Sequence, residues 1–164
     1  MKRLLVVFAV FVMSLVALPC FAISESQEKA IVDKCNEIKE QLKAVQKDDA
    51  RTRVHLGGRY ETILTSFMMP LNVRLLENNL SNVELVENQN SFAETKSLFN
   101  NDYIDYQQRL EELVALDCKK EPANFYEKLD KVRQKRKIVG QDALKLRNLI
   151  SKHVRLVTVL RGKI

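Results

Sequence analysis

Residues that make turns are scarce in this sequence: of 164 residues, only 4 are glycine and 3 are proline. A protein with many strands needs frequent turns, and turns favour glycine and proline. The scarcity therefore argues against a many-stranded fold. It leaves long uninterrupted segments that are suited to helices.

Histidine and cysteine, which are common in metal sites and in nucleophilic catalysis, are also few, with 2 and 3 copies. Neither His55 nor His153 lies at metal-ligand spacing with a third ligand. The sequence contains no nucleophile elbow, phosphate-binding loop or dinucleotide fingerprint. It thus predicts no catalytic residue, no metal site, no cofactor and no enzymatic activity. We expect His153 to be a hydrogen-bonded core or boundary residue near Glu87.

The longest uncharged segment spans residues 4–23 and directly follows Lys2 and Arg3. A basic start followed by an apolar stretch is typical of a secretion signal. Cleavage after Ala22 would place Cys20 and Ala22 at the small-residue positions that signal peptidase needs. We therefore expect residues 1–22 to be a signal peptide and the protein to be secreted, periplasmic or at the cell surface.

Two alternatives remain for this segment. Residues 4–23 are long enough to span a bilayer, which takes about 20 apolar residues, so they could instead anchor the chain in a membrane. A lipid on Cys20 is the other alternative. Pro19 argues against both, because it would sit near the end of the spanning helix and where lipoproteins carry a small residue.

Removal of residues 1–22 would leave 25 basic and 21 acidic residues, a net charge of +4, and two cysteines, Cys35 and Cys118. An even number of cysteines outside the cytosol favours a disulfide. A bridge between them would close a loop of about 83 residues, which is worth on the order of 4 kcal/mol. The sequence therefore predicts a Cys35–Cys118 disulfide.

Apolar residues recur at steps of three and four along three segments, which is the period of helices with coiled-coil-like seams. The predicted helices span residues 24–77, 82–118 and 122–161. Because the connections near residues 80 and 120 are short, successive helices should be antiparallel neighbours. The sequence predicts that residues 23–164 form one all-α domain, an elongated antiparallel three-helix bundle that follows an N-terminal signal helix.

The seam of the first helix slips by one residue at Gly57 and Gly58 and then continues at Tyr60, Ile63 and Phe67. Such a slip predicts a local change of winding or a bend. Pro70 predicts a second kink shortly afterwards.

The predicted disulfide also sets which residues face one another across the bundle. It places Leu42 near Leu110, so that apolar residues meet apolar ones. The polar residues that interrupt the seams would then meet at one level as a polar layer, which can fix the register while adding little net stability. The predicted layer consists of Asp49, Asp102 or Asp105, and Arg136.

Charge is distributed unevenly between the helices. Residues 81–118 carry eight acidic and two basic side chains, whereas residues 122–164 carry twelve basic and three acidic ones. Neighbouring helices of opposite charge can neutralise each other. The excess near the C-terminus could bind an anionic lipid or polymer, and export argues against nucleic acid. The candidate contacts are Lys152, Arg155, Arg161 and Lys163.

The segment SFMMPLNVRLL at residues 66–76 is dense in apolar side chains beside a proline. Two interpretations remain open: core around a bend, or an adaptable patch for a partner. The candidate patch residues are Phe67, Met68, Met69 and Leu71.

Three segments, KCNEIKEQLKAVQKDDARTRVHLGG, FMMPLNVRL and LDCKKEPANFY, resemble small exported helical proteins of candidate-phylum bacteria such as Saccharibacteria. The resemblance covers most of residues 23–164 and implies export, but it implies no activity and no functional residue. We therefore expect a non-catalytic protein with a structural or protein-interaction role toward a macromolecule at the cell envelope. Binding of anionic surfaces through the third helix is the alternative, and self-association through open seam residues is a further possibility.

Overall fold

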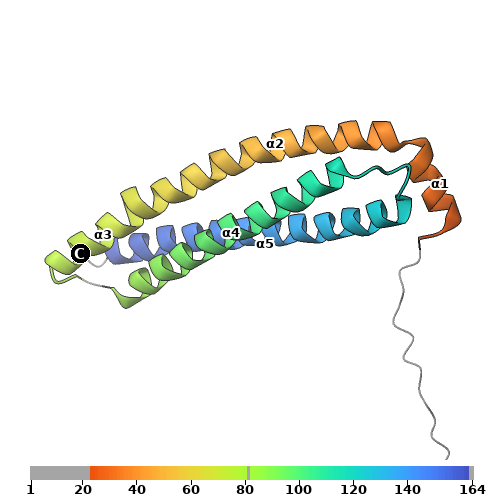
Figure 1. The fold of residues 1–164 in the computed structure, drawn as a ribbon. Coiled ribbons are helices and arrows are strands. Elements are labelled where there is room, and N and C mark those ends of the chain that lie inside the picture. The colour runs from red at the N-terminus through yellow and green to blue at the C-terminus, as the bar shows by residue number, and fades with distance from the viewer. Residues whose placement is uncertain (1–22, 81, 163–164) are drawn as a thin grey trace, which may run out of the picture.

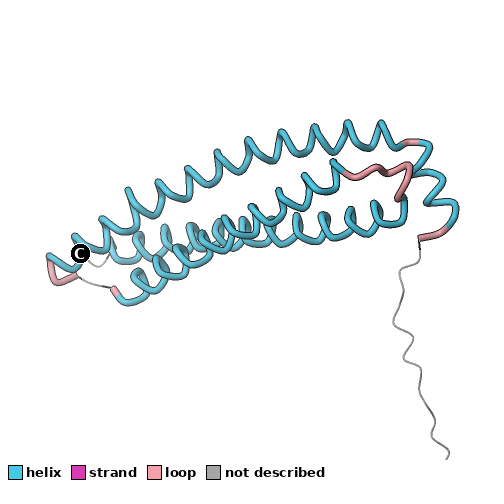
Figure 2. Tube along the Cα trace, viewed as in Figure 1, coloured by secondary structure: helices cyan, strands magenta, loops and turns pink. Residues whose placement is uncertain are grey.

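The structure, a computed structural model, describes residues 23–80 and 82–162. Every secondary-structure element in these ranges is helical, which confirms the predicted all-α class (Figure 2). The predicted signal peptide at residues 1–22, nearly all of the alternative anchor at residues 4–23, and Lys163 lie outside the described residues. Within the described ranges, no helix combines the length and apolar character needed to cross a bilayer.

The helices follow one another with short connections (Figure 1). In chain order they are α1 (Glu25–Asp33), α2 (Cys35–Thr62), the π-helix η1 (Ile63–Met68), α3 (Met69–Glu77), α4 (Val83–Ala115) and α5 (Pro122–Arg161). The residues at the junctions of α2, η1 and α3 have helical dihedral angles, so these three elements form one continuous helical stretch. α4 runs back beside this stretch, and α5 runs along α4 in the opposite direction (Figure 1).

The prediction of one helix over residues 24–77 is wrong near its start, because the helix is broken at Lys34. This residue has φ −102° and ψ 12°, which ends α1 before α2 begins. α1 has its own N-terminal capping box, in which the Ser24 hydroxyl accepts from the Gln27 N–H at 3.3 Å and the Gln27 side chain accepts from the Ser24 N–H at 3.1 Å. The break lets α1 turn toward the start of α5, where Ile31 is buried in the core (Figure 1).

The turn between α3 and α4 is a Schellman motif. The Leu80 N–H donates to the Leu75 carbonyl at 2.8 Å, and Asn79 has a positive φ of 56°, which asparagine tolerates better than most residues. The side chain of Asn82 then accepts a hydrogen bond from the Leu85 N–H at 3.3 Å and caps α4. These local signals reverse the chain direction near residue 80, where the sequence predicted a short connection.

The turn between α4 and α5 begins earlier than predicted. Leu116 is extended, with φ −66° and ψ 144°, so α4 ends at Ala115 and not at residue 118. Cys118 therefore lies in the turn, which is closed by hydrogen bonds to the Asp117 carbonyl. Pro122 occupies the first turn of α5, where its missing N–H needs no partner.

The change of winding lies in η1 and not at Gly57 and Gly58, which remain within α2. At its end the Met69 N–H donates to the Leu64 carbonyl, five residues back. The π-helix ends two residues before Pro70, which cannot donate a backbone hydrogen bond. The predicted change of winding is therefore present, but it lies in η1, several residues after the two glycines.

This wide turn also changes which residues are buried. Leu64 and Met68 enter the core, with 7% and 0% exposure, whereas Phe67 is 63% exposed and Ile63 is half-buried. The predicted continuation of the seam is therefore wrong at Phe67, whereas Tyr60 is buried and the half-buried Ile63 packs against the core. The cause is the extra residue that the π-helix accommodates within its turn.

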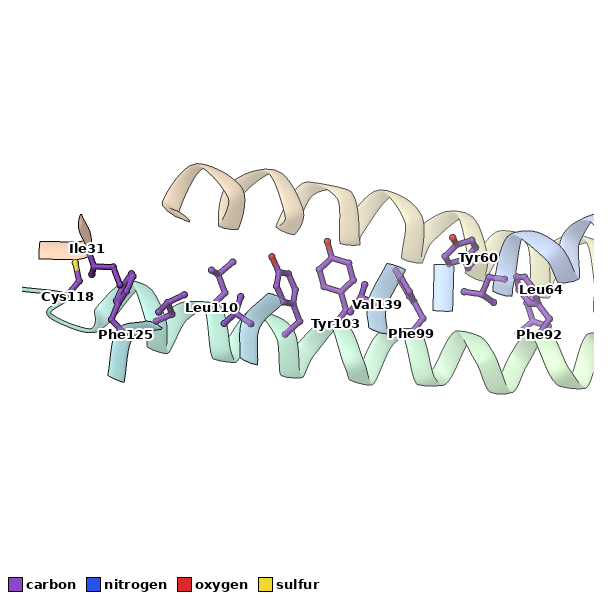
Figure 3. Close-up of a cluster of buried hydrophobic side chains, with 14 of the residues drawn as sticks. Ile31, Tyr60, Leu64, Phe92, Phe99, Tyr103, Leu110, Cys118, Phe125 and Val139 are labelled. Atoms are coloured by element: carbon purple, nitrogen blue, oxygen red, sulfur yellow. The ribbon is translucent and has the colours of Figure 1, made fainter. Parts of the chain in front are cut away.

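Aromatic side chains fill the middle of the core (Figure 3). Phe99 on α4 packs edge-on against Tyr60 of α2 at 5.4 Å and against Tyr103 at 5.5 Å between ring centroids. Such T-shaped contacts add to the free energy gained by burial. The core also includes Phe92, Tyr106, Leu110, Leu113, Phe125, Val132, Val139 and Leu146.

Candidate functional site

The predicted disulfide is present and closes one end of the molecule. Cys35 is the first residue of α2, Cys118 lies in the turn before α5, and their Cα atoms are 5.7 Å apart. Both residues are buried. The Lys39 ammonium donates to the Leu116 carbonyl at 3.1 Å and joins α2 to the same turn. The start of α2 is thus fixed to the connection between α4 and α5.

The structure brings Asp49 and Arg136 of the predicted polar layer together. The Arg136 guanidinium donates to both carboxylate oxygens of Asp49 at 3.1 Å, in the bidentate geometry that arginine favours. The Tyr106 hydroxyl donates to the same carboxylate at 2.6 Å, and the Tyr103 hydroxyl donates to the Asp49 carbonyl. One side chain of α2 is therefore bonded to both α4 and α5.

Asp102 and Asp105 do not join Arg136. Both face Lys135, with distances of 3.7 and 2.7 Å to its ammonium, and Asp105 also accepts from Arg109 at 2.8 Å. The hydrogen bond from Lys135 is the main reason that the pKa of Asp105 is lowered. The layer is thus divided into two groups, one around Asp49 and one around Lys135.

Both tyrosines of the layer remain protonated well above neutral pH. Burial raises the pKa of Tyr103 to about 12. Burial, together with the hydrogen bond to Asp49, also raises the pKa of Tyr106. The hydroxyls therefore act as stable donors, and the geometry suits a layer that fixes helix register.

Ion pairs engage four of the six cations in the first half of α5. These four cations pair with carboxylates of α2, α4 and α5 itself. The pairs are Lys128–Glu112, Lys131–Glu127, Lys135–Asp105 and Arg136–Asp49. In the part of the chain that the structure describes, no ion pair involves the exposed candidates Lys152, Arg155 and Arg161.

An open apolar hollow lies between the η1–α3 stretch and the end of α5. Its volume is about 520 Å³. Most of the side chains that line it are apolar; its walls include Phe67, Met68, Leu71, Ile150, Val154 and Val157, and Arg74 is its one formally charged residue. A concave, mainly apolar site with a few polar groups is the usual form of a ligand pocket.

A second hollow of about 540 Å³ continues the first toward the middle of the molecule. The two share Ile63 and Ile150 as lining residues. The second is lined also by Tyr60 of α2 and by two arginines from opposite walls, Arg59 of α2 and Arg147 of α5. We call the two hollows together the α2/α5 groove.

The predicted apolar patch is only partly at this groove. Phe67 and Leu71 line it, and Met69 is 44% exposed but lines a different, smaller hollow. Met68 is fully buried in the core and also forms part of the groove's floor. The segment therefore serves both as core and as the wall of an open site.

The contributions of α5 to the groove were not predicted from the sequence. Val154 is 60% exposed and faces the groove, and Arg147 lies in its second half. Val154 is an apolar residue one position after His153, which was expected in the core or at its boundary. Such off-seam apolar residues were the available signal that α5 has a second apolar face.

His153 is buried at the floor of the groove, with 8% exposure. Among the described residues its Nδ1 has no hydrogen-bond partner, so the predicted hydrogen-bonded role near Glu87 is not found at this atom. Burial lowers the pKa of His153 below its ordinary value of 6.5. The imidazole is therefore neutral at pH 7.

Replacing His153 by leucine is expected to raise the free energy of unfolding by about 1 kcal/mol at pH 8, because it removes an unsatisfied buried polar atom. In the wild type, His153 binds a proton more readily in the unfolded state than in the folded state, because its folded-state pKa is lowered. The free energy of unfolding of the wild type is therefore highest above about pH 6.5 and falls as the pH drops toward the lowered pKa. The gap between variant and wild type should therefore widen below about pH 6.5. Urea unfolding at several pH values tests this, and a gap that stays constant from pH 8 to 5 would contradict it.

No group of three or more histidine, cysteine or carboxylate side chains within the described ranges could hold a metal ion. Comparison of the chain with family models, with curated proteins and with solved structures finds no match.

Proposed function

We propose that this chain is a non-catalytic helical protein of the cell envelope that holds an apolar partner in the α2/α5 groove. In this proposal residues 1–22 direct export, and the stretch α2–η1–α3 forms an elongated antiparallel three-helix bundle with α4 and α5. The Cys35–Cys118 disulfide supports an oxidising compartment, where such bonds persist. The resemblance to exported bacterial proteins points the same way.

The observation that carries the proposal is the open, apolar groove at Ile63 and Ile150. Its two hollows of about 520 and 540 Å³ each fall in the range of ligand pockets, roughly 300–1,000 Å³. The disulfide end and the polar layer fix the register of the helices that form its walls. A groove held in this way is suited to binding, because its walls need little reordering when a partner enters.

Binding of N-phenyl-1-naphthylamine, a neutral apolar dye that fluoresces in apolar sites, tests this proposal in the full chain. We expect the wild type to bind the dye and Val154→Asp to bind it about tenfold more weakly, because a carboxylate would have to be buried against the dye. Val54→Asp is the matched control, since Val54 is 77% exposed on α2 and lines none of the hollows above. Equal dye binding by both variants would refute a binding role for the groove.

A second candidate function is electrostatic binding of anionic lipid or polymer through the end of α5. It is supported by the exposed cations Lys152, Arg155 and Arg161, which make no ion pair among the described residues. Salt-sensitive retention on an anionic polymer should then be lost when all three are changed to glutamine. Retention that is independent of these residues would exclude this candidate.

A further inference from the structure

The α2/α5 groove is elongated, because its two hollows adjoin each other between the α2–η1–α3 stretch and α5. They meet at Ile63 of η1 and Ile150 of α5, and both are open to solvent between the same two helical walls. The hollow toward the tip is lined mainly by apolar side chains, among them Leu71 and Val157. A groove of this form matches a long hydrocarbon chain better than it matches a compact ligand.

The charge along the groove has one sign. Its lining includes three arginines, Arg59, Arg74 and Arg147, and no aspartate or glutamate. Among the ion pairs of the described residues, none involves these arginines. Arginine binds carboxylates and phosphates through charge-assisted hydrogen bonds, often in pairs of parallel bonds.

The same charges argue against a second copy of the chain as the occupant. A partner copy that used this groove would bring its own Arg59, Arg74 and Arg147 to the interface, and juxtaposed like charges disfavour association. The lateral position of the groove between helices also suits a chain that enters it better than it suits a flat bilayer surface. An anionic partner with a flexible apolar tail satisfies both the charge and the shape.

We infer that the groove binds an anionic amphiphile with a single long hydrocarbon chain, of the class of fatty-acid anions. This inference rests on the proposed binding function of the groove. The head group lies in the hollow that Arg59 of α2 and Arg147 of α5 both line, and the tail fills the hollow toward α3, against Leu71 and Val157. The arginines select the charged head, and the apolar walls supply most of the affinity.

Fluorescence of cis-parinarate, a fatty-acid anion that becomes fluorescent in apolar sites, tests the inference in the full chain. The parinarate concentration is kept below the concentration at which parinarate forms micelles. We expect bound parinarate to be displaced by oleate at least about tenfold more effectively than by oleyl alcohol, which has a similar chain and a neutral head. Residues 1–22 are the same in every variant, so differences between variants report on the groove.

The double variant Arg59→Gln/Arg147→Gln should lose the preference for oleate while it still binds oleyl alcohol. Arg133→Gln/Lys137→Gln is the matched control, because it removes two exposed charges of α5 that do not line the groove. Val154→Asp should weaken binding of both ligands about tenfold, and Val54→Asp should change neither.

The failures of the two proposals are distinguishable. Equal displacement by oleate and oleyl alcohol, with Val154→Asp still weakening both, would overturn the anionic head group and leave the apolar groove standing. Absence of binding for both ligands and for the neutral dye would overturn the groove itself. Binding to vesicles of anionic phospholipid without binding of monomeric parinarate, unaffected by Arg59→Gln/Arg147→Gln, would identify a bilayer surface as the occupant and overturn the inference.

Discussion

Replacing both Cys35 and Cys118 by serine is expected to lower the free energy of unfolding by about 4 kcal/mol. The disulfide links residues 83 apart in sequence, so the unfolded wild type is constrained by a long closed loop and the variant is not. The two sites are 3% and 0% exposed, so the serine hydroxyls would also lose their hydration on folding. The loss is a large fraction of the 5–15 kcal/mol that is typical of a folded domain.

Urea unfolding of the oxidised wild type, the reduced wild type and the double variant measures this effect. Reductant should destabilise the wild type by nearly as much as the two substitutions do, and it should leave the double variant unchanged. Loss of the bridge should loosen the packing of α1 more than that of the other helices, because α1 contacts α5 beside the disulfide. If the double variant unfolded at the same urea concentration as the oxidised wild type, the bridge would have no stabilising role.

Replacing Phe99 by alanine should cost about 3–5 kcal/mol of stability, the usual range for a large aromatic residue removed from a core. Phe99 is fully buried, and its ring contacts both Tyr60 and Tyr103 edge-on. The substitution leaves a cavity between α2 and α4 at the centre of the aromatic row (Figure 3). Thermal or urea unfolding would measure the loss.

Phe67→Ala is the matched control, because it makes the same chemical change on the α2–η1–α3 stretch at a side chain that is 63% exposed. Its expected cost is below about 1 kcal/mol. This pair of variants also tests the winding of η1. If Phe67→Ala were as destabilising as Phe99→Ala, Phe67 would have to be buried on the seam, as the sequence first predicted. This result would contradict the winding of η1.

The helical class and the core of α4 could be predicted from periodicity alone. Phe92, Phe99, Tyr106 and Leu113 recur at a constant step of seven, and all four are buried. Their burial needs only that α4 present one face to its neighbours. The turns could also be predicted, because asparagine and proline act within a few residues of their own position.

The polar residues within α4 could not be placed in the same way. Asn88 and Thr95 are buried, although the three-and-four spacing of the apolar residues of α4 passes through Gln89 and Lys96 instead. α4 packs against α2 on one side and α5 on the other, so its buried face is wider than a single seam. Asn88 is held there by a hydrogen bond to the Leu149 carbonyl at 3.1 Å, a contact that depends on the packing of α5.

The polar layer shows where register arguments succeed and fail. The predicted register brought Asp49 opposite Arg136, and this pair forms. The choice of Lys135 as the partner of Asp102 and Asp105 depends on side-chain direction, which differs between adjacent residues of a helix. The groove was missed for a similar reason: the spacing between α2 and α5 follows from how each packs on α4 and is not encoded in either helix alone.

Export and closure of the disulfide are the central claim, and intact-mass analysis of the protein recovered from cells, with and without reductant, tests both together. We predict the mass of a polypeptide that begins at Ile23, and we expect this mass to increase by two hydrogens on reduction. A mass that retains residues 1–22, combined with thiols that are free before reduction, would contradict the claim and would require another explanation for the pairing of Cys35 with Cys118.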